Sequence, residues 1–135
     1  MSLEKEFVPY EEALTLKELG FDEPCFYQYV RDFDNDGELI PIVSDSNYPI
    51  LRNNTQVSNC SGGDCFAAPL YQQAFRWFRE KYNYYISVFR THDGSWGVDL
   101  WLLGVHKPKA TIFSETYEEA ELACLKKLIK IAKNK

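Results

Sequence analysis

Three aspartates at alternate positions are the strongest chemical signal in the sequence. Asp32, Asp34 and Asp36 are followed directly by Gly37. Oxygen ligands at alternate positions with a turn glycine open the calcium-binding loop of the EF-hand type, so these carboxylates could hold a divalent cation. That loop also needs a bidentate glutamate at its twelfth position, where this sequence has Val43. The sequence therefore holds at most an incomplete metal site.

The residues around the aspartates favour a hairpin over a pair of helices. Segment 25–31 is aromatic and β-branched, and Pro41 stands where a second helix would have to begin. Residues 35–37 are turn formers that tolerate positive φ and close a hairpin without a metal. We therefore expect a plain turn and no cofactor, and a weak Ca²⁺ or Mg²⁺ site on the three aspartates stays open as an alternative.

Two of the four cysteines lie in a segment where a thiol could also do chemistry. Cys60 and Cys65 occur in a polar, glycine-rich stretch. Zinc would need His92 and His106 to complete its ligands, and these histidines follow no recognised finger spacing. Inert loop cysteines, a redox-sensitive pair and a zinc site are the three interpretations left open.

Aromatic residues in two predicted strands form a second candidate site. The strands 84–90 and 96–103 flank a His-Asp-Gly-Ser turn, and their aliphatic residues alternate with aromatic and polar ones. The alternate positions share one face of a sheet, which suits contact with a protein or a sugar unless a helix of the chain covers it. The predicted binding residues are Tyr85, Phe89, Asp99 and Trp101.

Capping signals predict three helices that would support these strands. Pro9 suits the first turn of a helix that ends before Gly20, and a second helix spans 69–82. Thr116 and Glu119 form a capping box for a third helix that runs from about Tyr117 to Lys133. The predicted buried side of that third helix consists of Ala120, Cys124, Leu128 and Ile131.

The remaining pattern predicts strands and one long loop. A first hairpin pairs 26–33 with 39–43, and a short strand over 110–113 follows the second hairpin. Residues 44–68 form a polar loop that is long enough to suggest a function. The expected fold is a single α+β domain over 1–135, with two antiparallel hairpins and a short strand packed against three helices.

Two similarities of topology bear on function. Both halves of the sequence consist of a helix followed by a hairpin, which suggests an internal repeat. From Pro69 onward the order is helix, three strands, helix, as in a double-stranded-RNA-binding domain. Such a domain needs basic residues at the start of its last helix, whereas segment 114–120 is acidic. The sequence therefore disfavours RNA binding.

Composition limits the classes of function further. The 135 residues are 45% apolar and 16% aromatic, which is enough for one domain with an aromatic-rich core. A formal charge of -5 disfavours nonspecific attraction to nucleic acid or to anionic lipid. No long apolar run and no signal peptide are visible, so we expect a cytoplasmic protein without membrane contact.

Three segments carry a resemblance to a known family. LKELGFDEPCF, APLYQQAFRWFREKYN and YEEAELACLKKLI together cover about a third of the chain. They resemble a family of short uncharacterised proteins of bacteriophages and prophages of gut bacteria. The resemblance implies a phage-related accessory protein in the cytoplasm of the host cell, and it implies no established activity and no catalytic residues.

These observations lead to one expected function and two alternatives. We expect a noncatalytic protein that binds another protein through its aromatic surface and the loop 44–68. One alternative is a divalent-metal-dependent enzyme of the phosphodiesterase type, centred on Asp32, Asp34 and Asp36. The other is a nucleic-acid binder that uses the lysine-rich C-terminal helix. The sequence leaves the oligomeric state open.

Overall fold

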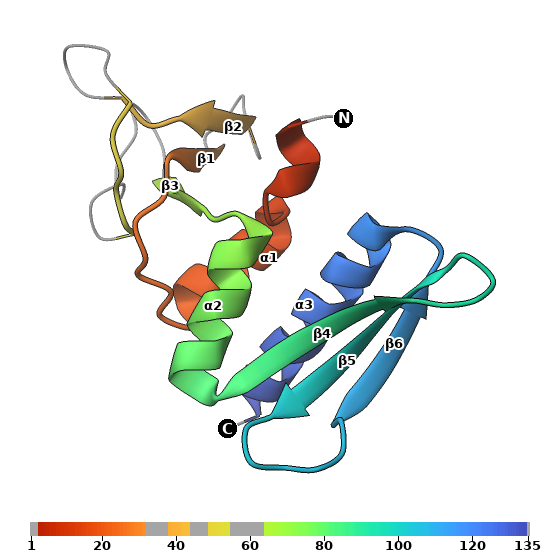
Figure 1. Ribbon diagram of the computed structural model, residues 1–135. Coiled ribbons are helices and arrows are strands. Elements are labelled where there is room, and N and C mark those ends of the chain that lie inside the picture. The colour runs from red at the N-terminus through yellow and green to blue at the C-terminus, as the bar shows by residue number, and fades with distance from the viewer. Residues whose placement is uncertain (1–2, 32–37, 44–48, 55–63, 135) are drawn as a thin grey trace. The chain divides into compact units, whose positions relative to one another are not determined.

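The chain is described as a computed structural model that places residues 3–31, 38–43, 49–54 and 64–134. Within these ranges the fold class is α+β, as predicted, with three α-helices and two antiparallel three-stranded sheets (Figure 1). The chain divides into two compact units, Met1–Gln73 and Ala74–Lys135. The single domain over 1–135 stays a prediction.

The first unit holds one helix and the first sheet. A short 3-10 helix, η1 (Leu3–Glu6), precedes α1 (Tyr10–Glu18). The predicted hairpin is present as β1 (Tyr27–Arg31) and β2 (Glu38–Pro41), which pair antiparallel. A further strand, β3 (Asp64–Ala68), pairs with the other side of β1, so β1 is central in the order β2-β1-β3.

Helix α1 ends as its sequence predicts. Gly20 has φ of 99°, a left-handed conformation that glycine adopts without steric cost. Its N–H donates to the Lys17 carbonyl at 3.0 Å, and the N–H of Phe21 donates to the Leu16 carbonyl at 2.8 Å. Two such bonds make a Schellman motif, in which the apolar residue after the glycine packs back on the helix. Phe21 and Leu16 are accordingly both buried.

The prediction of an unbroken loop over 44–68 is wrong at its end. Asp64–Ala68 is strand β3, with Phe66 opposite Tyr29 in the register. Residues 65–68 are all buried, so the strand lacks the alternation of apolar and polar residues that identifies a half-buried strand. A short apolar run directly after a polar segment is therefore easily joined to the loop. Residues 44–48 and 55–63 lie outside the described part of the chain.

Asn54 ties β3 to the end of α1. Its side chain is buried, and its amide nitrogen donates to the Phe21 carbonyl at 2.8 Å. Its amide oxygen accepts from the N–H of Ala67 at 2.7 Å. One side chain thus satisfies two backbone groups, and in the low-dielectric interior either group would be costly to leave unpaired.

Aromatic side chains form much of the core of this unit. The rings of Tyr29 and Phe66 lie with their centroids 5.7 Å apart, and Tyr10 packs on Phe66 at 5.1 Å. The Tyr29 hydroxyl donates to the Val8 carbonyl at 2.6 Å, so this buried polar group has a partner. The aromatic-rich core expected from composition is present here.

The second unit is built on a sheet whose strands follow one another along the chain. Helix α2 (Tyr71–Tyr82) spans the boundary between the units and leads into β4 (Tyr84–Arg90). Strands β5 (Trp96–Leu102) and β6 (Ala110–Ser114) complete the order β4-β5-β6. Helix α3 (Tyr117–Lys133) then packs against β5 and β6. The predicted bounds of these elements are confirmed to within one or two residues.

The capping box of α3 is present in part. The prediction that Ile131 belongs to the buried side of this helix is wrong. The Thr116 hydroxyl accepts from the N–H of Glu119 at 3.1 Å. Ala120, Cys124 and Leu128 are buried as predicted, whereas Ile131 is half-exposed. The buried positions 124, 128 and 132 are spaced by four residues, and each such step turns about 40° further around the helix, so the buried stripe drifts away from the side that carries Ile131. The further buried apolar residues are Leu125, Ile129 and Ala132.

Candidate binding surface on the second sheet

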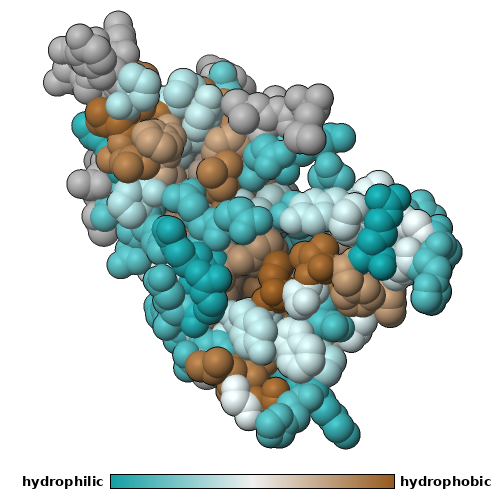
Figure 2. All heavy atoms as spheres, viewed as in Figure 1, coloured by the Kyte–Doolittle hydropathy of each residue, from teal (hydrophilic) through white to brown (hydrophobic). Residues whose placement is uncertain are grey.

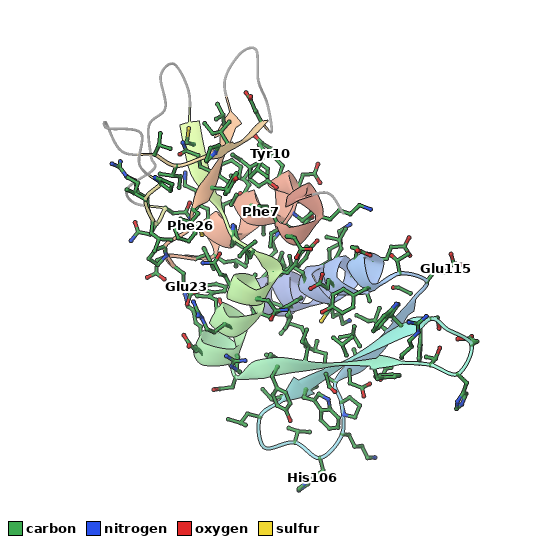
Figure 3. The ribbon with its side chains drawn as sticks, turned by 45° about the horizontal axis from the view of Figure 1, so that its top comes forward. Phe7, Tyr10, Glu23, Phe26, His106 and Glu115 are labelled. Atoms are coloured by element: carbon green, nitrogen blue, oxygen red, sulfur yellow. The ribbon has the colours of Figure 1, made fainter. Side chains whose placement is uncertain are left out.

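The β4-β5-β6 sheet has an inner face and an outer face. Helix α3 packs on the inner face, where Val98 and Leu100 are fully buried. Figure 3 shows α3 on one side of this sheet, and successive side chains of a strand point to opposite sides. We call the side opposite α3 the outer face. It consists of Tyr85, Ser87, Phe89, Gly97, Asp99, Trp101, Thr111 and Phe113.

Cross-strand pairing sorts the outer face into rows. Tyr85 lies opposite Trp101, and their rings are stacked at 6.3 Å with 9° between their planes. The next row is polar and pairs Ser87 with Asp99 and Asp99 with Thr111. The Thr111 hydroxyl donates to the Asp99 carboxylate at 2.7 Å. A polar row therefore adjoins the first aromatic pair.

A glycine permits the second aromatic pair. Phe89 lies opposite Gly97 on one side, and Gly97 lies opposite Phe113 on the other. A Cβ atom on Gly97 would stand 2.3 Å from the Phe89 ring, so the ring occupies the space that a side chain would need. From this position Phe89 meets Phe113 edge to face, with centroids 6.1 Å apart and 86° between planes.

The rings of the outer face are partly open to solvent. Phe113 is 63% exposed and Tyr85 is 37% exposed, while Phe89 and Trp101 are half-buried. Among the described residues only Leu103 is a more exposed large apolar side chain than Phe113. On the side of the molecule seen in Figure 2, hydrophobic residues form small patches between hydrophilic ones. The outer face thus presents two partly exposed aromatic pairs, separated by the polar row.

The structure brings all four predicted binding residues together. Tyr85, Phe89, Asp99 and Trp101 share the outer face, because each occupies the alternate position that the sequence pattern assigned to it. The other interpretation, coverage by a helix, applies to the opposite face, where α3 lies. Phe113 was missed, although its place two residues after Thr111 in a predicted strand was a usable signal.

The turn between β4 and β5 uses its acidic residue for structure. The Asp93 carboxylate accepts hydrogen bonds from the Thr91 hydroxyl, from the Ser95 N–H at 3.1 Å and from the Ser95 hydroxyl at 2.9 Å. These bonds lower the pKa of Asp93 to about 2, and the bond from Thr91 has the largest effect. The interpretation of His92 and Asp93 as turn residues fits this geometry.

Two thiols are placed where they are unreactive. Cys25 and Cys124 are fully buried, and burial raises the pKa of each thiol to about 12. The nearby carboxylates of Glu23 and Glu121 add to this effect. Since the thiolate is the reactive form, neither thiol is suited to nucleophilic chemistry, and Cys124 has the core role that its place on the third helix predicts.

The predicted metal-ligating residues lie largely outside the described part of the chain. This is true of Asp32, Asp34, Asp36 and Cys60. Contrary to the loop prediction, Cys65 is buried in β3, and it is disulfide-bonded. His106 is exposed in the loop before β6 (Figure 3). Within the described ranges, no group of three or more His, Cys, Asp and Glu side chains could hold a metal ion.

The C-terminal lysines lie on the solvent side of α3. Lys126, Lys127, Lys130 and Lys133 are exposed, as a solvated helix face requires. The first turn of the same helix carries Glu118 and Glu119. The helix therefore has acids at one end and bases at the other, which complements its macrodipole.

Comparison with known proteins adds no family to this picture. The chain matches no protein-family model, no curated protein and no solved structure. The resemblance to phage and prophage proteins therefore stays a prediction. In the residues that the structure describes, no helix has both the length and the apolar character to cross a membrane.

Proposed function

We propose that this chain is a noncatalytic, phage-related accessory protein that binds another protein through the outer face. The observation that carries the proposal is the pair of aromatic contacts, Tyr85 with Trp101 and Phe89 with Phe113, on a sheet face that α3 leaves open. Aromatic side chains with few rotatable bonds give large contact areas at low entropic cost, and they dominate the binding energy of many interfaces.

The polar row of Ser87, Asp99 and Thr111 can set the orientation of a partner on the outer face. Asp99 is half-buried and already bonded to Thr111, so its carboxylate is held in place before a partner arrives. A preorganised acceptor beside apolar rings matches the usual anatomy of an interface, in which aromatic anchors supply affinity and polar groups set orientation. The polar segment that precedes β3 belongs to the proposal as a second contact, and the outer face is the principal one.

A pair of matched phenylalanine variants tests the proposal. Phe113 on the outer face and Phe26 in the first unit are both exposed, at 63% and 53%. The wild-type protein, Phe113→Ser and Phe26→Ser would each be immobilised, bacterial host lysate passed over them, and retained proteins identified by mass spectrometry. Circular dichroism would verify that each variant is folded.

We expect one stoichiometric partner that the wild type and Phe26→Ser retain and that Phe113→Ser loses. Only Phe113→Ser removes an aromatic ring from the outer face. Equal retention by both variants would place the interface elsewhere. Failure of the wild type to retain any protein would count against protein binding itself.

One observation favours a second candidate, nucleic-acid binding by α3. The exposed lysines 126, 127, 130 and 133 could contact phosphates, and such affinity falls steeply with added salt. A gel-shift assay at low salt with duplex RNA and single-stranded DNA tests this candidate. A shift that disappears with salt supports it, and the absence of any shift removes it.

A further inference from the structure

Strand β6 is an edge strand without the features that usually prevent edge pairing. An edge presents unpaired backbone N–H and C=O groups, and proteins commonly block it with proline or charge. The edge strand β2 follows this rule, since it carries Glu38 and Pro41. Strand β6 reads Ala-Thr-Ile-Phe-Ser and contains neither. In the part of the chain that the structure describes, only β5 pairs with β6, so the other side of its backbone can pair with a further strand.

We propose that β6 pairs antiparallel with β6 of a second copy of this chain, with Ile112 on the two-fold axis. An antiparallel strand pair is self-complementary, so each residue meets its symmetry counterpart in an isologous interface. In this register Ala110 lies opposite Ser114 of the second copy, and Thr111 lies opposite Phe113 of the second copy. The faces are preserved, because both members of each pair belong to the same side of the sheet.

The charges that flank β6 select this register. Lys109 directly precedes the strand and Glu115 directly follows it, and both are exposed. Figure 3 shows Glu115 where the chain leaves β6 toward α3. Extending the pairing by one residue places Lys109 opposite Glu115 of the second copy, and the two-fold axis repeats this contact. A shift of two residues would separate Lys109 from Glu115; in one direction it would bring Lys107 opposite Glu115, but Lys107 lies in a bend before Pro108 and outside the strand.

Burial on β6 agrees with an additional strand on that edge. Ile112 belongs to the inner face but is only half-buried, and Phe113 on the outer face is 63% exposed. In the proposed pair, Ile112 would contact its own counterpart, and Phe113 would gain Thr111 of the second copy as a cross-strand neighbour. The two sheets would become one sheet of six strands, with the two outer faces side by side.

The size of the contact determines the expected strength. One strand of five residues and two exposed ion pairs bury much less area than a permanent dimer does. We therefore expect a weak dimer whose population rises with protein concentration and falls with added salt. This inference is independent of the protein partner proposed above, since its test uses the purified chain alone.

Charge reversal tests the register. Sedimentation equilibrium at low salt over a range of concentrations would compare the wild type with Lys109→Glu, Glu115→Lys and the double variant. Each single change converts two attractions into two repulsions, so it should weaken dimerisation by about tenfold or more. The double variant exchanges the charges and should restore the wild-type dimer. Lys107→Glu is the control, because Lys107 is exposed but lies outside the paired residues.

The outcomes separate clearly. Pairing of β6 about Ile112 is supported if both single variants weaken the dimer, the double variant restores it, and the control variant leaves it unchanged. A wild-type protein that stays monomeric at every concentration overturns the inference. A dimer that both single variants leave unchanged, or that the folded double variant fails to restore, overturns it as well, because the interface would then lie elsewhere.

Discussion

The two sheets of this chain use aromatic residues in opposite ways. In the first sheet Tyr29 and Phe66 are buried, whereas in the second Tyr85 and Phe113 lie on the exposed outer face. Both sheets have three antiparallel strands, so architecture alone does not decide the role of a ring. The difference teaches that a high aromatic content can serve a core and a recognition surface within one small chain.

The strand orders differ as well. The first sheet runs β2-β1-β3 and the second runs β4-β5-β6. The shared pattern of helix followed by hairpin, which suggested a repeat, therefore does not extend to the third strand of each sheet. The similarity between the two halves is local, and the two units use their hairpins within different topologies.

Truncating one ring in each sheet tests this contrast most strongly. Phe66→Ala should lower the free energy of unfolding by about 3–5 kcal/mol, because it leaves a cavity where a fully buried ring was. Phe113→Ala should lower it by less than about 0.5 kcal/mol, because that ring is mostly in solvent already. Urea unfolding followed by far-UV circular dichroism measures both. Equal losses would contradict the division into core and surface rings.

Asn54 tests how firmly the first unit depends on a single polar contact. Asn54→Ala should lower the free energy of unfolding by about 2–4 kcal/mol, since it removes the buried hydrogen bonds that the Asn54 side chain makes to the Phe21 carbonyl and the Ala67 N–H. Asn134→Ala, an exposed position at the end of α3, is the control and should have a small effect. Thermal melting of the two variants measures these effects. Similar melting temperatures would contradict the structural role assigned to the Asn54 side chain.

Gly97 tests the arrangement of rings on the outer face. Gly97→Ala should force the Phe89 ring away from its position and cost about 1 kcal/mol, because the new methyl group overlaps the ring. In a Phe89→Ala background the same change should cost almost nothing. A double-mutant cycle by urea unfolding gives this coupling directly. Additive effects would mean that Phe89 does not lie over Gly97 in solution.

The β4–β5 turn gives the smallest expected effect. The depressed pKa of Asp93 means that its carboxylate stabilises the folded state fully above its ordinary pKa of 3.8. This contribution is lost as pH falls through about 2, where the folded-state carboxylate gains its proton. An NMR titration of the side-chain carboxyl carbon should therefore have a midpoint near 2. Thr91→Val should move it upward, and an unchanged midpoint in that variant would disprove the assigned cause.

The sequence predicted those elements whose signals are local. Helix ends at Gly20 and Thr116 are set by backbone and side-chain groups within a few residues, and both are present in the structure. Strand β3 was missed because its identity depends on pairing with β1, which is distant along the chain. Ile131 was placed wrongly because a helical stripe drifts over several turns.

The sequence also predicted only part of the candidate site. Alternation along β4 and β5 was enough to assign Phe89 and Trp101 to one face. It could not give the partner of each ring, because that depends on the register between strands and on the third strand. Gly97 was the unused signal, since a glycine inside a strand often marks the close approach of another group.

The central position of β1 also matters during synthesis of the chain. Strand β2 follows β1 closely, whereas β3 begins only at Asp64. One side of β1 therefore lacks its partner while residues 32–63 are added, which takes about 2–6 s at ordinary rates of translation. The strands of the second sheet are made in the order in which they pair. The nascent first unit is thus the part of this protein most open to mispairing on the ribosome.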